Sequence, residues 1–329
     1  MANSDKIRAG RNRTLTVSEE EIPDLKRIIT FPEELSGKSS FVDLLINADA
    51  LTVFDKIPDE CASLIINLSK TFNSSKFNAM SDNMYEEYLR TWFKKVCDKL
   101  KPDGSLYMCG DWKCSSSQQK VISEELTVIN RITWQREKGR GAKTNWKNAM
   151  EDIWFAVKDK DNYYFDVDSV KMKRQVIAPY KENGKPKDWE ETDEGNFRIT
   201  FPSNFWDDIS IPFWSMPENT DHPTQKPEKL IAKLILASSR PGDVVFDPFV
   251  GSGTTCVVAK KHGRHYLGIE IDEEYCLWAA KRLTRADKDL EIQGYNGGFF
   301  WERNTLNLQK KSTSVKHPRP EEYNQTLFG

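Results

Sequence analysis

One segment limits the fold of this 329-residue chain more than any other, namely VVFDPFVGSGTTCVVAKK at residues 244–261. Its apolar start predicts a buried strand that ends on Asp247, and its small residues predict a glycine loop at residues 251–253. Thr254 or Thr255 is then expected to cap a helix. A strand, a glycine loop and a helix in this order are typical of a nucleotide-binding parallel sheet, because glycines let a ligand approach the backbone closely.

An acidic residue follows at the distance where such a sheet presents one to ribose hydroxyls. Glu270 ends the apolar run LGIE, about 20 residues beyond the glycines. Together with Asp247, which can hold an amine, it predicts an adenosine-like ligand. A P-loop is disfavoured because no Gly-Lys-Ser/Thr follows, and Cys256 takes the third glycine position of the dinucleotide fingerprint. The alternative is a glycine turn that serves only tight packing.

Short apolar runs alternate with helical stretches along most of the chain. ASLII (62–66) and SLYMCGDW (105–112) predict strands, and the helix between them is expected to stop at Pro102 and Gly104. The alternation returns after residue 217. This pattern predicts an α/β fold with a mainly parallel, twisted sheet flanked by helices. The intervening residues are rich in aromatic, glycine and charged residues, which indicates an inserted recognition region.

Composition excludes several classes of protein. The 48 Lys+Arg nearly balance the 50 Asp+Glu, so any nucleic-acid affinity must come from a local patch. No segment approaches the roughly 18 apolar residues of a membrane span, and the start lacks the apolar region of a signal peptide. The six cysteines form no CxxC pair, which favours reduced, buried thiols over a disulfide or zinc framework. We therefore predict a cytoplasmic protein with no membrane partner and no metal.

Three motifs together resemble the beta-group DNA amino-methyltransferases, which modify adenine N6 or cytosine N4. DPFVGSGTT (247–255) resembles their S-adenosylmethionine loop, HPTQKPEKLI (222–231) the companion motif, and INADALTVFDKIPDECASLII (46–66) the opening segment. The family is circularly permuted, so the catalytic strand comes first, a target-recognition region next and the cofactor half last. This chain shows that order. The resemblance therefore implies a Rossmann-like, permuted methyltransferase fold with S-adenosylmethionine as cofactor.

The resemblance also implies site residues and divisions of the chain. Glu270 is included because of its distance beyond the glycines. The predicted cofactor-binding residues are then Asp49, His222, Thr224, Lys226, Asp247, Phe249, Gly251, Ser252, Gly253, Thr254 and Glu270. Taken singly, Thr224 also suits a helix start and Asp49 an Asx turn. The implied parts are a polar N-terminal extension (1–40), a catalytic half (41–129), a target-recognition region (130–217), a cofactor half (218–284) and a C-terminal tail (285–329).

A basic segment in the target-recognition region is the candidate DNA contact. REKGRGAKTNWKN (136–148) places cations beside Trp134 and Trp146. This composition suits phosphate contact together with stacking on an extruded base, whereas a solvated surface loop is the alternative. Its position between the two halves favours double-stranded DNA. The predicted DNA-binding residues are Arg136, Lys138, Arg140, Lys143 and Lys147.

The catalytic tetrapeptide of the resembling family is missing. There, the strand DLII is followed by Asp/Asn/Ser-Pro-Pro-Tyr/Phe, which accepts hydrogen bonds from the exocyclic amine and stacks on the flipped base. No Pro-Pro-Tyr or Pro-Pro-Phe occurs in this chain. Either the tetrapeptide is lost between Ile66 and Asn67, which we favour because residues 67–70 match the sequence that follows it, or residues 69–72 are a degenerate copy. No catalytic residue is intact, and the neighbours of the gap are Asn67, Ser69, Lys70 and Phe72.

Three functions stay open. The leading one is S-adenosylmethionine-dependent methylation of an exocyclic DNA amine, with adenine N6 favoured and this chain inactive or badly impaired. The second is a module that binds DNA and cofactor without turnover, which tight DNA binding without transfer would select. The third is an RNA or protein methyltransferase or a nicotinamide oxidoreductase, which poor binding to duplex DNA would favour. A second copy of the chain and a cognate restriction endonuclease stay open as partners.

Overall fold

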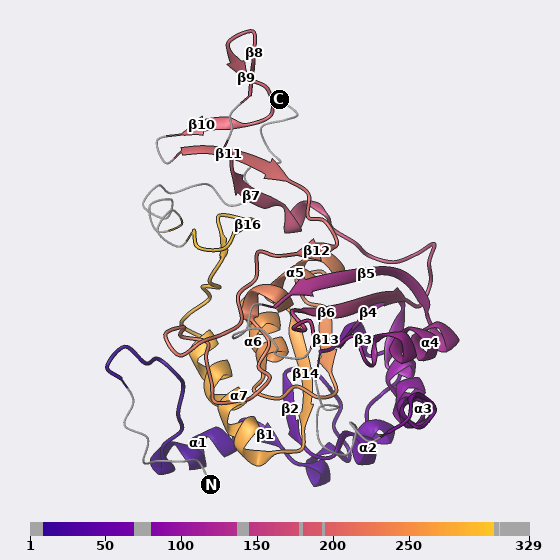
Figure 1. The fold of residues 1–329 in the computed structure, drawn as a ribbon. Helices are drawn as coiled ribbons and strands as arrows, with labels where there is room; N and C mark the ends of the chain where they lie inside the picture. Colours follow the sequence, from indigo (N-terminus) through magenta and orange to yellow (C-terminus); the bar gives the residue numbers. More distant parts are fainter. Residues whose placement is uncertain are drawn as a thin grey trace, which may run out of the picture.

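The computed structural model describes residues 9–68, 80–136, 145–177, 180–192, 195–305 and 309. A nine-stranded sheet forms the centre of the molecule, and a five-stranded sheet projects from one end (Figure 1). Within these ranges no helix is long and apolar enough to cross a membrane. The six cysteines, all described, are free thiols.

The nine-stranded sheet is parallel except at one strand. Its order is β1 (Ile29–Thr30), β2 (Leu44–Asn47), β14 (His265–Glu270), β13 (Val244–Asp247), β3 (Ala62–Asn67), β4 (Leu100–Gly110), β6 (Met150–Val157), β5 (Thr127–Gln135) and β12 (Phe205–Trp206). Only β6 runs antiparallel to its neighbours, β4 and β5. The predicted mainly parallel sheet is confirmed. Its central strands are continuous apolar runs because helices cover both faces.

Helices pack on the two faces of this sheet (Figure 1). One group is α5 (Glu228–Ser238), α6 (Thr254–Lys261) and α7 (Glu273–Ala286), and the other is α3 (Asp82–Asp98) and α4 (Ser115–Glu125). Alternate residues of β3 serve the two sides, since Leu64 and Ile66 belong to the core under α5–α7 and Ile65 to the core under α3. The sheet therefore separates two apolar cores.

The helix before β4 ends earlier than predicted. α3 stops at Asp98, and Pro102 and Gly104, which were expected to end it, lie within β4. The β3–β4 register shifts between Ala62 and Leu64, opposite this part of β4. Such an irregularity accommodates a proline, which has no N–H for the ladder. The strand thus starts at Leu100, before the predicted SLYMCGDW run.

The predicted boundary at residue 130 falls within β5. Because β5 and β6 belong to the nine-stranded sheet, residues 130–135 and 150–157 are part of the central domain. The five-stranded sheet instead combines the middle region with the predicted tail, in the order β10 (Glu190–Thr192), β11 (Gly195–Thr200), β7 (Met172–Gln175), β16 (Phe299–Trp301) and β15 (Tyr295–Asn296). β16 joins this sheet because Phe300 and Trp301 are buried apolar side chains.

The remaining elements are short. The N-terminal extension supplies the edge strand β1 and α1 (Ile22–Lys26), so it is part of the folded domain. A two-stranded hairpin, α2 and four 3-10 helices complete the described chain: β8 (Lys181–Glu182), β9 (Lys185–Pro186), α2 (Ala50–Val53), η1 (Glu19–Glu21), η2 (Pro32–Leu35), η3 (Phe54–Lys56) and η6 (Asp168–Val170).

Two buried lysines of α5 fasten the five-stranded sheet to the central domain. Lys233 Nζ lies 2.8 Å from Asp208 Oδ1, and Lys229 Nζ lies 2.6 Å from Asp208 Oδ2 and also donates to the Trp301 carbonyl of β16. Burial lowers the pKa of Lys233 to about 8, although Asp208 opposes the shift. All three charges are nearly fully buried, so each depends on the others for compensation.

Candidate active site

The carboxyl ends of β13 and β3 mark the point where the connections of the sheet diverge. From β13 the chain passes through α6 to β14 on one side, and from β3 it passes through α3 to β4 on the other. In open α/β sheets, ligands bind beyond the carboxyl ends of the strands at such a switch point. The predicted cofactor loop and the predicted catalytic segment follow these two neighbouring strands.

Asp247 organises the loop that follows β13. Its Oδ1 accepts a hydrogen bond from the Phe249 N–H at 3.0 Å, and its Oδ2 accepts one from the Thr255 hydroxyl at 2.6 Å. The side chain is almost fully buried, and burial raises the pKa of Asp247 to about 7. The carboxylate therefore both shapes the loop and titrates near neutral pH.

Neither threonine caps α6, so that prediction is wrong. The N-cap is Gly253, whose φ of +83° suits a residue without a Cβ. The Thr255 hydroxyl is used by Asp247, and the Thr254 hydroxyl donates to the Lys226 carbonyl at 3.1 Å. The hydroxyls thus hold the loop to its surroundings, not to the first turn of the helix.

The two loop glycines allow close approach of other segments. A Cβ on Gly251, whose φ is +56°, would lie 2.9 Å from His222 Nε2. A Cβ on Gly253 would lie 2.5 Å from the Ala279 Cβ of α7. Both values are shorter than a carbon contact permits. The loop therefore requires glycine for its backbone angles and for its packing.

Glu270 supports the loop from the end of β14. Its Oε2 accepts from the Gly251 N–H at 2.8 Å and its Oε1 from the Asp272 N–H at 3.0 Å. Burial raises the pKa of Glu270. Just beyond the neighbouring strand β2, Asp49 caps α2 by accepting from the Leu51 N–H at 3.0 Å, and its side chain is exposed. Three predicted acids thus lie at the carboxyl ends of adjacent strands.

The companion motif lies against the glycine loop. The His222 ring contacts the Tyr275 ring edge-on at 4.4 Å between centroids and faces Gly251. Burial, aided by the charges of Lys226 and Arg282, lowers the pKa of His222 to about 4, so the imidazole is neutral at pH 7. The neighbouring Thr224 N–H donates to His222 Nδ1 at 3.3 Å. The structure therefore brings together two motifs that are about 25 residues apart in the chain.

Lys226 is engaged by a buried carboxylate. Its Nζ lies 3.0 Å from Glu151 Oε2. Glu151 also pairs with Arg136 and accepts from the Cys109 thiol at 3.2 Å. The Trp134 ring lies near both cations, 6.0 Å from Lys226 Nζ and 5.7 Å from the Arg136 guanidinium carbon. One buried carboxylate thus holds two cations, one that follows β5 and one from the companion motif.

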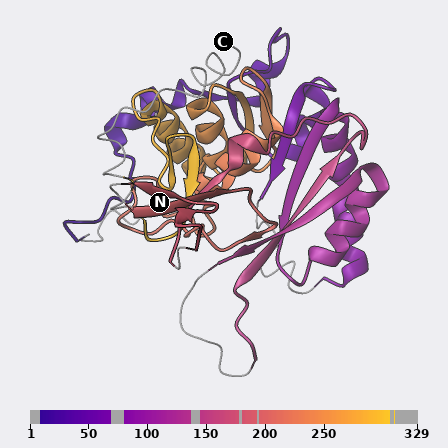
Figure 2. The same ribbon diagram turned by 90° about the horizontal axis from the view of Figure 1, so that it is seen from above.

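The predicted DNA-binding residues differ in their exposure, and some lie outside the described part of the chain. Arg136 is partly buried and pairs with Glu151, and Trp134 is 1% exposed, so Trp134 presents no surface on which a base could stack. Trp146 is 95% exposed, and Lys147 beside it is partly buried. Residues 145–149 extend away from the body of the molecule (Figure 2). The remaining predicted cations, Lys138, Arg140 and Lys143, lie outside the described residues.

The predicted catalytic neighbours are divided in the same way. Asn67 is the last residue of β3, pairs in register with Met108 of β4 and is 3% exposed. Ser69, Lys70 and Phe72 lie outside the described residues. Phe249, predicted to touch the cofactor, packs edge-on against Trp92 of α3 at 5.2 Å between ring centroids.

Sequence reasoning missed two charged residues of this site, Glu151 and Arg282. Glu151 is the second residue of β6 and is buried between an exposed and a half-buried neighbour, so the sequence pattern gives no sign of its burial. Arg282 lies on the buried face of α7, at helical spacing from Ala279 and Ala286. A charge at an apolar position of a helix is the signal that could have identified Arg282.

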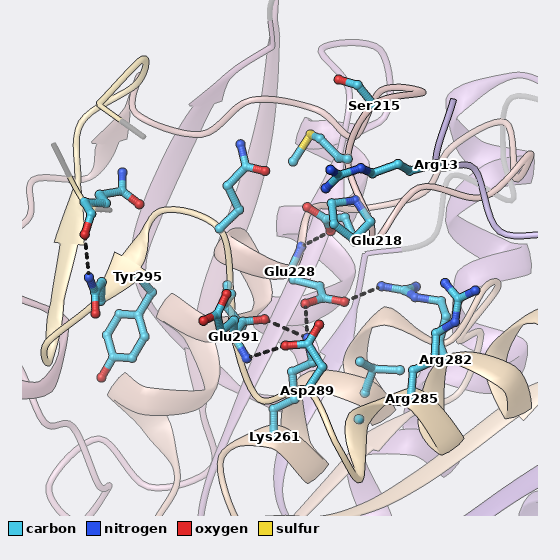
Figure 3. Close-up of a pocket in the computed structure, with 18 of the residues that line it drawn as sticks. Arg13, Ser215, Glu218, Glu228, Lys261, Arg282, Arg285, Asp289, Glu291 and Tyr295 are labelled. Carbon is cyan, nitrogen blue, oxygen red and sulfur yellow. Dashed lines mark hydrogen bonds and ion pairs between the residues drawn. The ribbon is translucent and has the colours of Figure 1, made fainter. Parts of the chain in front are cut away.

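A cavity of about 560 Å³ lies on the α6–α7 side of the loop (Figure 3). It shares no lining residue with the predicted cofactor-binding set. Glu228, which lines it, pairs with Lys261 at 2.8 Å and with Arg282 at 2.9 Å. Because none of its lining residues belongs to the predicted cofactor-binding set, the cavity is not the ligand site that the motifs predict.

Comparison with known sequences gives a family and several relatives. The DNA methylase family (N6_N4_Mtase) matches residues 64–281. The chain is 32% identical over 279 residues to the DNA adenine methyltransferase YhdJ of Escherichia coli K12, covering 82% of this chain and 90% of that protein. It is 30% identical over 259 residues to the type II methyltransferase M.HpaI of Haemophilus parainfluenzae, covering 77% and 76%.

Solved structures share the fold. The cytosine-N4-specific PvuII DNA methyltransferase superposes with a TM-score of 0.56 at 20% identity, covering 73% of this chain and 85% of that one. TTHA0409 of Thermus thermophilus, a DNA modification methylase solved with S-adenosyl-L-methionine, gives a TM-score of 0.50 at 20% identity, covering 79% and 98%. The predicted Rossmann-like methyltransferase fold is confirmed.

Proposed function

Because this chain belongs to the DNA methylase family of N6 and N4 methyltransferases, we propose that it binds S-adenosylmethionine at the loop after β13 and presents it to an exocyclic amine of DNA. One observation carries the proposal. Asp49, Glu270 and Asp247 end or follow three adjacent strands, around a glycine loop next to the switch point with β3. S-adenosylmethionine is the methyl donor of this family.

The residues present fit this cofactor. A loop without Cβ atoms at residues 251 and 253 lets a ligand approach the backbone. We assign Asp247 to the methionine amine and Glu270 to the ribose hydroxyls. Each carboxylate oxygen that now accepts one backbone or hydroxyl hydrogen bond retains capacity for another. When bound, the cofactor supplies an electrophilic methyl group, and the protein supplies its orientation.

DNA is the proposed substrate, with adenine N6 favoured over cytosine N4. A relative whose match covers 82% of this chain is named a DNA adenine methyltransferase. Trp146 offers an exposed aromatic surface for a base, and Lys147 is next to it. Since M.HpaI and M1.MboII are named type II methyltransferases, we extend to this chain the prediction of a restriction-modification role with a cognate endonuclease. A homodimer stays a prediction.

We further propose that this chain transfers methyl groups poorly or not at all. The sequence contains neither Pro-Pro-Tyr nor Pro-Pro-Phe after β3 or elsewhere. Without the tetrapeptide, none of the proposed cofactor-binding residues is placed to accept hydrogen bonds from the target amine or to stack on its base. The second candidate function, binding of DNA and cofactor without turnover, is favoured by this same observation.

Isothermal titration calorimetry of the unmodified chain with S-adenosylhomocysteine, followed by titration with mixed-sequence duplex DNA, tests the proposal. We expect both ligands to bind. Failure to bind S-adenosylhomocysteine would refute the cofactor assignment. Binding of S-adenosylhomocysteine together with a preference for RNA or protein over duplex DNA would refute the substrate assignment and leave the cofactor assignment intact.

A further inference from the structure

The guanidinium of Arg282 lies beneath the glycine loop. Arg282 is on α7 and is 3% exposed. Its Nη1 donates to the Ser252 carbonyl and to the Thr254 hydroxyl, each at 2.9 Å. Its Nη2 donates to Glu228 Oε1 at 2.9 Å. One side chain therefore joins the loop, α7 and the first residue of α5.

We propose that Arg282 is a positioning residue that holds the glycine loop in the shape that binds S-adenosylmethionine. The inference rests on the proposed function and extends it to a residue outside the cofactor motifs. Asp247 and Glu270 hold the loop from the strand side, at the N–H groups of Phe249 and Gly251. Arg282 holds the opposite side, at residues 252 and 254.

The loop depends on such external contacts because of its glycines. Gly251 and Gly253 both have positive φ, and glycine has more conformations to lose on ordering than other residues. A loop that is already ordered before the ligand arrives binds it more tightly, because no conformational entropy of the loop is lost on binding. Removing the contact of Arg282 is therefore expected to weaken cofactor binding even where the fold survives.

A guanidinium suits this position better than an ammonium. Its donors form a planar fork that can reach a carbonyl, a hydroxyl and a carboxylate at fixed angles. The Thr254 hydroxyl accepts from Arg282 and donates to the Lys226 carbonyl at 3.1 Å. Arg282 thereby directs the bond between the loop and the companion motif. Lysine could keep the charge but not all of these contacts.

Glu228 fixes the orientation of the guanidinium (Figure 3). Its two oxygens bind Arg282 at 2.9 Å and Lys261 at 2.8 Å. Glu218 Oε2 accepts from the Glu228 N–H at 2.8 Å, and burial, aided by the charge of Glu228, raises the pKa of Glu218. Glu218 therefore holds the backbone of Glu228, while both oxygens of Glu228 bind cations.

The test compares Arg282→Met and Arg282→Lys with the matched control Arg285→Met. Arg285 is on the same helix, lines the same cavity and is exposed, and none of its hydrogen bonds in the described chain reaches the loop. The dissociation constant for S-adenosylhomocysteine is measured by calorimetry at a temperature where circular dichroism shows each variant folded. We expect roughly ten- to a hundredfold weaker binding for Arg282→Met, an intermediate value for Arg282→Lys and less than about a twofold change for the control.

Affinity at a temperature where the protein is folded separates positioning from a merely structural role. A structural role would lower the melting temperature and leave the dissociation constant of the folded protein unchanged, which would overturn the inference. If Arg282→Met does not fold, Arg282→Lys decides, with hydrogen exchange of residues 247–257 as a second measurement. Faster exchange with weaker binding supports the inference, whereas unchanged exchange and affinity overturn it. Absence of binding by the parent chain would instead refute the proposed function.

Discussion

β13 and β3 are neighbouring buried strands that end at the same edge of the sheet, yet their following segments differ. The loop after β13 resembles the cofactor loop of the family, and its polar groups bind one another, as in the contacts of Asp247 and Glu270. The segment after β3 lacks the catalytic tetrapeptide in sequence. One strand therefore leads to a loop that is built into the fold, and the other leads to a segment whose sequence contains no Pro-Pro-Tyr or Pro-Pro-Phe.

The difference between these two segments suggests that cofactor binding and methyl transfer can be lost separately. Side chains of the cofactor loop contact other parts of the protein, so their loss would destabilise the fold as well as the site. The tetrapeptide of the family acts on the target base, so its loss costs chemistry without removing core contacts. We expect a chain with this pattern to fold and bind cofactor while failing to transfer methyl groups.

Repair of the gap should give the largest effect. Insertion of Asp-Pro-Pro-Tyr between Ile66 and Asn67 restores acceptors for the target amine and an aromatic for its base, so we expect methyl transfer to rise by about a thousandfold or more, in line with the loss of a positioned catalytic group. Transfer of labelled methyl groups to mixed-sequence DNA measures the rate, and nucleoside analysis should show N6-methyladenine. Replacement of residues 69–72 by Ser-Pro-Pro-Tyr is the matched alternative repair. Efficient transfer by the unrepaired chain would contradict the inactivity proposal.

Removal of the carboxylate at the end of β13 should give the second largest effect. Asp247→Ala removes the proposed partner of the cofactor amine and leaves the Thr255 hydroxyl and the Phe249 N–H without their acceptor. We expect cofactor binding to weaken by about 1–3 kcal/mol, the usual cost of stranding buried polar groups. Calorimetry with S-adenosylhomocysteine measures the loss. Parent-like affinity in the folded variant would remove the assignment of Asp247.

A change of pH should alter cofactor binding less than the Asp247→Ala substitution does. Burial raises the pKa of Asp247 to about 7, whereas an unfolded aspartate titrates at about 3.9, so the folded state retains the proton between these values. The stabilisation from this group is complete below about pH 4 and is lost as the pH rises toward 7. An ammonium needs the carboxylate, so we expect affinity to increase by up to about tenfold from pH 6 to pH 8.

Asp247→Asn is the control for this dependence, since it cannot ionise. His222 has its pKa lowered to about 4 by burial and stays neutral throughout the range. Burial and the charge of Glu228 raise the pKa of Glu218, but this residue lines the cavity behind the loop. A pH profile that is identical in the parent and in Asp247→Asn would assign the dependence to another group.

Neutralising the basic segment should give the smallest effect per residue. Replacement of Lys138, Arg140 and Lys143 by alanine should weaken duplex binding and reduce the slope of log affinity against log salt by about one for each phosphate that is no longer neutralised. Arg136→Ala is the contrast, because Arg136 pairs with buried Glu151. Its removal should lower the free energy of unfolding, measured in urea, and leave the salt slope unchanged. An unchanged slope in the triple variant would make the segment a solvated loop.

The sequence by itself determined the cofactor loop and the type of sheet. VVFDPFVGSGTT contains a strand, its terminal acid and two glycines within twelve residues, and the structure forms them where the letters predict, with Asp247 ending β13. Local spacing suffices here because the period of apolar residues defines a strand, and positive φ requires glycine at specific positions. Permuted motif order likewise identified the family that the sequence comparison shows.

The tertiary structure alone decided which distant side chains meet. Glu151 and Lys226 are 75 residues apart, Arg282 and Ser252 are 30 apart, and β16 pairs with β7 across the whole cofactor half. A local pattern indicates that Arg136 or Arg282 lies on an element, and at best that the position is buried, but it does not name the partner. A buried charge persists only with compensation, and that compensation comes from whichever segment the fold places against it.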